Sequence, residues 1–222
     1  MSGSLLWGIL TFFVVAVLAV WLGRSTDMLR DSQPVDFGGA KPPGGGIYRR
    51  PYSLAQTQMT WWFCIVIASY VYIAGSTGKI SGVLNEQSLI LMGIGIGTAL
   101  GATAIEQAKK GYPTLDTFNA VVKQIDTLNA AGAPIPPGVI AQRDTLAADL
   151  ASETFLRDIL TDVDGVSLHR FQSVAWTVVL GVAYVLSVFA QHALPEFDKL
   201  LLAVLGISGA TYLGFKVPEQ PA

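Results

Sequence analysis

The sequence predicts an all-α integral membrane protein with five transmembrane helices, and two observations carry that prediction. Of the 222 residues, 51% are hydrophobic and only 14% are charged, whereas soluble domains carry about 25% charged residues. The apolar residues also gather in five blocks, each close to the length of about 20 residues that a membrane-spanning helix needs. The expected architecture is one anchor helix plus a duplicated, parallel two-helix unit, with a small cytoplasmic helical hairpin.

The net charge and the cysteine content exclude several classes of protein. A net charge of −2 gives no basic surface for nucleic acid. The single cysteine, Cys64, lies inside an apolar block, so it provides neither a disulfide framework nor a cysteine-based metal site.

The first apolar block, Leu5–Leu22, is typical of an uncleaved anchor, which we assign to residues 1–23. No positive charge precedes it, and Arg24 and Arg30 follow it. A cleavable signal peptide would have a basic start and a shorter apolar core of about 7–15 residues. We therefore expect the amino end outside the membrane.

Four further blocks complete the five spans. They are the run between Arg50 and Lys79 centred on Thr60–Ala74, then Gln87–Ile105, Phe171–Leu194 (which includes His192) and Leu200–Phe215. The last block is short, and its flanking residues Lys199 and Lys216 are expected to extend to the membrane interfaces.

Basic residues predict the orientation of these spans. Residues 23–52 and 106–170 together with Lys216 hold 12 of the 14 Lys and Arg. The positive-inside rule then places these segments and the carboxyl end in the cytoplasm.

An internal repeat relates residues 53–106 to residues 167–222. The matching pairs include Ser53 with Ser167, Gln58 with Gln172, Trp62 with Trp176, Thr98 with Thr211, Gly101 with Gly214 and Glu106 with Glu219. Both units begin and end on the same side of the membrane, so we expect parallel repeats related by an axis along the membrane normal.

Serines are expected to cap the first helix of each repeat. Ser53 and Ser167 precede the apolar runs, and a serine hydroxyl can accept from a first-turn amide. Gln56 would complete a capping box in the first repeat, whereas Arg170 replaces it in the second.

Small residues recur at four-residue spacing on the second helix of each repeat. Such spacing lets helices approach closely in lipid. Two interpretations stay open: tight packing within or between subunits, or the wall of an oligomeric pore. The candidates are Gly93, Gly97, Thr98, Gly101, Gly206, Ala210, Thr211 and Gly214.

Four further residues are candidates for a cytoplasmic mouth: Gln58, Gln172, Glu106 and Glu219. The alternatives are interfacial hydrogen bonding for the glutamines and solvated helix ends for the glutamates. Because a glutamate is unfavourable at a helix carboxyl end, we expect Glu106 to have a basic partner such as Lys109, Lys110 or Arg170.

The sequence predicts no enzyme, no cofactor and no metal site. No Asp, Glu, Lys or Arg lies well inside a predicted span, which argues against an ion-coupled pump. The segment Gly75–Lys79 resembles a phosphate loop but lacks its Ser/Thr. His169 and His192 are expected on opposite sides of the membrane.

Two segments are expected in the cytoplasm. Residues 24–52 form a Gly/Pro-rich linker, expected to be disordered unless a partner or another subunit holds it. Residues 107–166 form a helical hairpin with helices at Thr117–Ala131, Val139–Leu150 and Phe155–Leu160. The hairpin is too small for a core of its own, so its apolar stripe needs the membrane domain, a sister subunit or a partner protein.

Two strings, Ser167–Thr177 and Gly206–Lys216, resemble segments of an uncharacterised family of bacterial polytopic inner-membrane proteins. The resemblance lies mainly in the second repeat. It implies a bacterial cytoplasmic membrane and no particular function.

Two functions are compatible with these features. The first is a homo-oligomeric channel or pore-like assembly packed through the small-residue helices. The second is a membrane anchor or scaffold subunit that recruits a partner protein through residues 107–166 and the linker. In both, the lipid bilayer surrounds the helices and nucleic acid plays no part.

Overall fold

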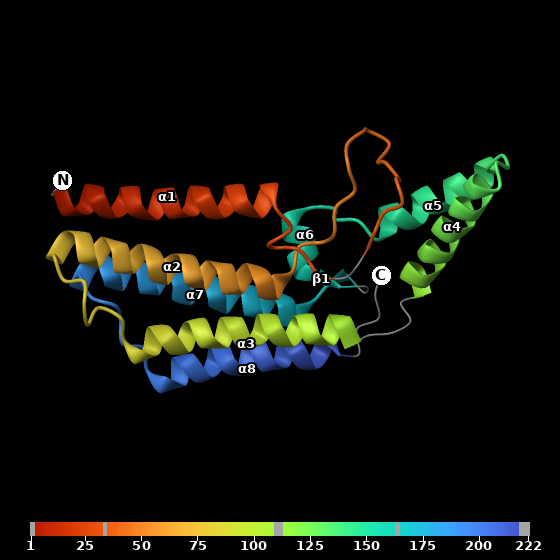
Figure 1. Cartoon of the computed structure of the whole chain (residues 1–222). Coiled ribbons are helices and arrows are strands. Elements are labelled where there is room, and N and C mark those ends of the chain that lie inside the picture. Colours follow the sequence, from red (N-terminus) through yellow and green to blue (C-terminus); the bar gives the residue numbers. More distant parts are fainter. Residues whose placement is uncertain (1–2, 33–34, 109–112, 163–164, 218–222) are drawn as a thin grey trace.

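The five long apolar helices expected from the sequence are present. The computed structural model describes residues 3–32, 35–108, 113–162 and 165–217. Eight helices occur in these ranges, and five are long and apolar enough to cross a membrane. These five run side by side as the membrane bundle (Figure 1): α1 (Gly3–Ser25), α2 (Leu54–Thr77), α3 (Glu86–Ala108), α7 (Leu168–Gln191) and α8 (Lys199–Lys216). The all-helical class is therefore confirmed, with five helices that are long and apolar enough to cross a membrane.

Four of the long helices enclose one apolar core. Helix α2 contacts α3 and α7, and α8 also contacts α3 and α7, while α1 packs along α2. Trp62 and Tyr72 from α2 meet Tyr184 and Val188 from α7 in the interior, and all four side chains are buried. A two-fold arrangement of the two repeats would place α2 beside α7 and α3 beside α8, and both contacts are present. The duplication itself stays a prediction.

Glycines allow close approach between α2 and its neighbours. A Cβ atom at Gly75 would lie 2.2 Å from the Trp7 indole nitrogen of α1. At Gly181 of α7, a Cβ would lie 2.6 Å from the indole nitrogen of Trp61. Each tryptophan thus lies directly against a neighbouring helix backbone, which is how small residues strengthen packing in lipid.

The fourth span ends earlier than expected. The sequence places His192 within the span, but α7 ends at Gln191, and His192 has a left-handed backbone with φ of 51°. Its N–H donates to the Val188 carbonyl at 3.0 Å. A left-handed residue at this position closes the last turn and cannot continue the helix.

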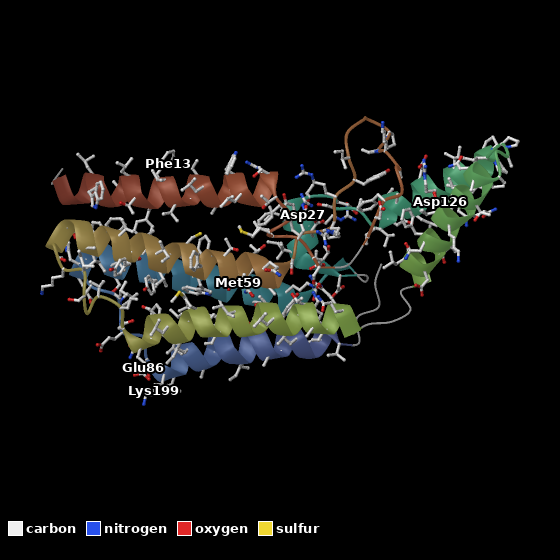
Figure 2. The ribbon with its side chains drawn as sticks, in the orientation of Figure 1. Phe13, Asp27, Met59, Glu86, Asp126 and Lys199 are labelled. Carbon is white, nitrogen blue, oxygen red and sulfur yellow. The ribbon has the colours of Figure 1, made fainter. Side chains whose placement is uncertain are left out.

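Three further helices and a small ribbon lie at one end of the bundle, which we call the junction end. They are α4 (Pro113–Ala130), α5 (Pro137–Asp149), α6 (Phe155–Leu160), β1 (Thr161–Asp162) and β2 (Gly165–Val166), with the two strands antiparallel. Helices α4 and α5 form an antiparallel hairpin that projects beyond the bundle (Figure 1). Glu86 and Lys199 lie at the opposite end (Figure 2).

The linker supplies the surface that covers the hairpin. Phe37 and Tyr48 pack with the buried side chains of Phe118 on α4 and Leu150 after α5. The ring centroids of Phe37 and Phe118 are 6.3 Å apart. We call residues 35–48 together with α4 and α5 the hairpin unit. The surface that covers the apolar stripe of the hairpin is therefore the linker of the same chain, which the sequence analysis does not name among the three covering surfaces it expects.

Phe118→Ala tests this packing. Phe118 is fully buried, so its truncation is expected to cost about 3–5 kcal/mol locally. We expect faster backbone hydrogen exchange in residues 35–48, measured by mass spectrometry, with unchanged exchange in α2 and α7. The control is Gln124→Ala, on the exposed face of α4. Unchanged exchange in residues 35–48 of the Phe118 variant would contradict the packing.

Candidate functional site

A buried cluster of charges joins the ends of two membrane helices at the junction end. Lys216, in the last turn of α8, has its ammonium against the Oε1 atom of Glu106 in the last turn of α3. The two side chains are only 5% and 4% exposed. The Lys216 ammonium also donates to the Tyr212 hydroxyl at 3.1 Å and lies 3.9 Å from Oδ1 of Asp31. We call these four residues the charged cluster.

The charged cluster also holds the chain that follows α1. The second carboxylate oxygen of Glu106 accepts from the Ser32 hydroxyl at 2.7 Å and from its backbone N–H at 3.1 Å. Glu106 therefore uses both oxygens, one toward a cation and one toward two donors. Hydrogen bonds to a charged partner are the stronger kind, so residues 31–32 are fixed against α3 and α8.

Asp31 is the member whose titration lies nearest to neutral pH. Desolvation by the surrounding protein raises the pKa of Asp31 to about 6, the nearby Glu106 carboxylate also raises it, and Lys216 acts in the opposite direction. The folded state therefore binds this proton more tightly than the unfolded chain. Its ionisation lowers stability progressively as the pH rises from about 4 to 6.

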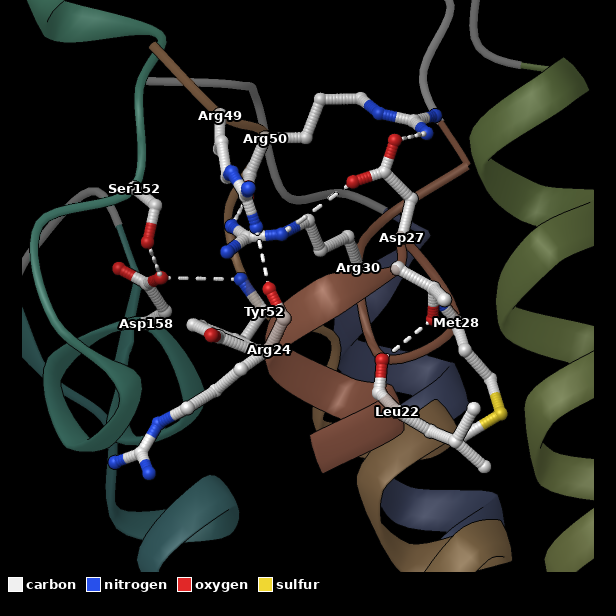
Figure 3. A network of polar contacts seen from close by, with 11 residues as sticks. Leu22, Arg24, Asp27, Met28, Arg30, Arg49, Arg50, Tyr52, Ser152 and Asp158 are labelled. Atoms are coloured by element: carbon white, nitrogen blue, oxygen red, sulfur yellow. Dashed lines mark hydrogen bonds and ion pairs between the residues drawn. The ribbon is translucent and has the colours of Figure 1, made fainter. Parts of the chain in front are cut away.

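A second set of contacts joins the two ends of the linker. Backbone bridging pairs Arg30 with Tyr52, and the buried Arg30 guanidinium lies 4.2 Å from the centre of the Tyr52 ring. Arg30 also donates to the Arg50 carbonyl, and Arg50 forms an ion pair with Asp27 at 3.1 Å (Figure 3). The linker thus leaves and returns to the bundle at one place.

Asp158 of α6 attaches the segment that follows the hairpin to this place. Its Oδ2 atom accepts from the Tyr52 N–H at 3.0 Å and from the Ser152 hydroxyl at 2.5 Å (Figure 3). The Ser152 N–H donates to the Arg49 carbonyl at 2.7 Å. Residues 49–52 are therefore held from two sides, by the chain after α1 and by the chain after α5.

These contacts hold segments that are distant in the sequence against one another. In the charged cluster the cation and both carboxylates face one another, and the hydroxyls serve as hydrogen-bond donors or acceptors to them. Across the described ranges, no group of three His, Cys, Asp or Glu could hold a metal ion. The arrangement can restrain these segments relative to one another.

The structure separates the four mouth candidates. Gln58 lies between α2 and α7, where its amide donates to the hydroxyls of Ser173 at 2.8 Å and Thr177 at 2.7 Å. Gln172 is exposed on α7. Glu106 belongs to the charged cluster, and Glu219 lies outside the described residues. The interfacial interpretation of Gln58 therefore has direct contacts in its favour.

The small-residue candidates divide between an inner and an outer position. Thr98 and Gly101 contact α8: a Cβ at Gly209 would lie 2.6 Å from the Thr98 hydroxyl oxygen, and one at Gly101 would lie 2.8 Å from Leu213. The others face outward or have open space beside them. A Cβ would meet no heavy atom within 4 Å at Gly93, Gly97, Gly206 and Gly214, and Ala210 and Thr211 are exposed.

The predicted serine caps have the right position but do not make the expected hydrogen bonds. Ser53 and Ser167 do stand at the N-cap positions of α2 and α7, but neither hydroxyl accepts from the first turn. The Ser167 hydroxyl lies 2.8 Å from Nδ1 of His169. The Ser53 N–H, which a capping box would direct to Gln56, donates instead to the Leu29 carbonyl at 2.8 Å.

The sequence interpretation missed Lys216 as a site residue. Lys216 was expected at the membrane interface, yet its side chain turns inward to Glu106. The expectation of a solvated helix end at Glu106 is wrong, because its side chain is buried against Lys216. The expectation of a basic partner is confirmed, but that partner is Lys216. Lys109 and Lys110 lie outside the described residues. One available signal was the spacing of Tyr212 and Lys216, which places them on one face of a helix.

Comparison with known protein families, with curated proteins and with solved structures finds no match to this chain.

Lys216→Met tests the charged cluster. Loss of the cation leaves two carboxylates facing each other, and breaking a buried pair in this way costs about 3–5 kcal/mol. We expect the free energy of unfolding in mixed micelles to fall by that amount. Lys199→Met, at the exposed start of the same helix, is the matched control and should change little.

A second substitution separates charge from packing. Adding Glu106→Gln to the Lys216 variant removes one unpaired charge, so it should recover part of the lost stability. An additive loss in the double variant would contradict the pairing.

Proposed function

We propose that the chain is a non-enzymatic polytopic membrane protein that acts as an anchor or scaffold, holding its hairpin unit out for a partner protein. One observation carries the proposal: polar contacts restrain the chain on both flanks of the hairpin unit. Before it, Ser32 is held by Glu106 of α3. After it, Asp158 of α6 is held by Tyr52, two residues before α2 begins. A segment that served only as a connection between spans would not need such restraint.

The composition of the hairpin unit supports the same proposal. Its apolar stripe is covered by the linker, so the outward surface consists largely of polar and charged side chains, among them Asp116, Lys123 and Asp126. A partner would be recognised by charge and hydrogen bonding on a preformed surface. Such interfaces give specificity more than raw affinity.

The proposal includes a location. Following the distribution of basic residues, the hairpin unit lies in the cytoplasm and the amino end of α1 lies outside. The resemblance of Ser167–Thr177 and Gly206–Lys216 to bacterial inner-membrane proteins supports a bacterial membrane. Arg24, Arg49 and Arg50 at the junction end then face the cytoplasmic leaflet.

Replacement of the hairpin tests the scaffold. Pro113–Asp149 would be exchanged for a Gly/Ser linker, which keeps Ser152 and Asp158 and therefore the junction contacts. After cross-linking in native membranes and purification, we expect the proteins recovered with the natural chain to be missing from this variant. Lys79→Gln, at the opposite end of the bundle, should recover the natural set. Recovery of the same proteins without the hairpin would contradict the scaffold.

A channel-like homo-oligomer is the second candidate, and the outer glycines favour it. Gly93 and Gly97 are exposed on α3 with open space beside them, so a helix of another copy could approach the backbone there. Trp62, Tyr72 and Tyr184 fill the interior of one copy, so any conducting path would lie between copies.

Cysteine cross-linking tests the oligomer. In a Cys64→Ala background, Gly97→Cys is expected to form disulfide-linked dimers in membranes on oxidation. Phe13→Cys, on the outward face of α1 (Figure 2), is the control and should stay monomeric. Reconstitution in planar bilayers should then give conductance. Absence of both cross-links and conductance at any voltage or pH would contradict the channel.

A further inference from the structure

An apolar groove of about 590 Å³ runs along the membrane bundle between α1, α2 and α7. Its volume falls within the range of about 300–1,000 Å³ that is typical of small-molecule sites. Ala16 and Ala19 of α1, Ala68 of α2 and Val182 of α7 line its length. Helix α1 packs along α2, and these small side chains leave the space open on the α7 side.

The position of the groove restricts what can occupy it. The three long helices that line most of it are all candidate membrane spans, so along these helices the groove opens toward hydrocarbon. At the junction end, Leu29, Tyr52 and Phe155 also line it. An occupant of its apolar length must itself be an extended hydrocarbon. The acyl chains of the bilayer surround the groove at very high concentration, and one of them fits this description.

The junction end of the groove has a different chemistry. Arg24 lines it there, and this exposed guanidinium makes no hydrogen bond or ion pair with any residue that the structure describes. In Figure 3 its side chain extends away from the polar network. Arg49 donates to the Arg24 carbonyl at 2.6 Å, which keeps a second cation close by.

A threonine lies beside this cationic end. Thr57 of α2 also lines the groove, and its hydroxyl is buried without a hydrogen-bond partner among the described residues. A buried unpaired hydroxyl is costly. The Thr57 hydroxyl is therefore a free donor between the apolar length of the groove and Arg24. A phospholipid has its groups in the same order: acyl chain, ester, then phosphate.

We propose that this groove binds one acyl chain of an anionic phospholipid, whose phosphate is held by Arg24. The two arginines favour a lipid with net negative charge over a zwitterionic one, since an ammonium headgroup would add a third cation. A helix from a second copy would fill the apolar length but would leave Arg24 without an anion. Among the described spans, the one acidic residue at the junction end is Glu106, which is already paired with Lys216.

Native mass spectrometry of the purified full chain tests the site, with phosphatidylglycerol and phosphatidylcholine as probes. We expect the natural protein to retain phosphatidylglycerol about fivefold better, the effect of roughly one basic residue at a membrane surface. Arg24→Gln should abolish that preference, whereas Arg24→Lys should keep most of it. The matched control is Lys41→Gln, an exposed cation of the linker outside the groove.

A second variant tests the apolar part of the site. Ala16→Phe places a ring in the groove from an exposed position, so it should reduce retention of both lipids while helicity stays unchanged. Equal retention of the two lipids by the natural protein would overturn the proposal. Unchanged binding in Arg24→Gln or in Ala16→Phe, or a dimer without bound lipid that Ala16→Phe dissociates, would overturn it as well.

Discussion

The ion pair between Lys216 and Glu106 is the interaction on which the arrangement of the junction end depends. Charged groups at the ends of membrane helices normally reach water, and burying them carries a desolvation cost that an excellent partner geometry must offset. Here the pair joins α3 to α8, and the remaining oxygen of Glu106 holds Ser32 after α1. A buried pair of this kind is weak as a source of stability. Its effect is to allow one arrangement of three chain segments and to disfavour the others.

The fold class was predictable because it follows from local properties. A helix in lipid satisfies its own backbone hydrogen bonds, so length and hydropathy are enough to locate α1 and its four companions. The linker was not predictable in this way. Phe37 and Tyr48 stand among glycines and prolines with no period, and their contact with Phe118 exists only after the hairpin has folded.

The candidate site was predictable only in part, and the reason is distance along the chain. Helix electrostatics correctly required a cation for Glu106, and the nearest basic residues in sequence were the natural expectation. Lys216 is the cation that pairs with Glu106 because α8 lies beside α3. That adjacency is a property of the folded bundle. The serine caps failed for a related reason: the Ser53 N–H is already occupied by the Leu29 carbonyl, a partner that no sequence window around Ser53 contains.

The charged cluster has a consequence for biosynthesis. Its members enter the nascent chain in the order Asp31, Glu106, Tyr212 and Lys216, so both carboxylates emerge from the ribosome long before their cation. Until α8 has been inserted, α3 carries an unpaired acidic end that water must solvate. Insertion of α8 therefore completes the junction end, because it brings Lys216 to the two carboxylates that precede it in the chain.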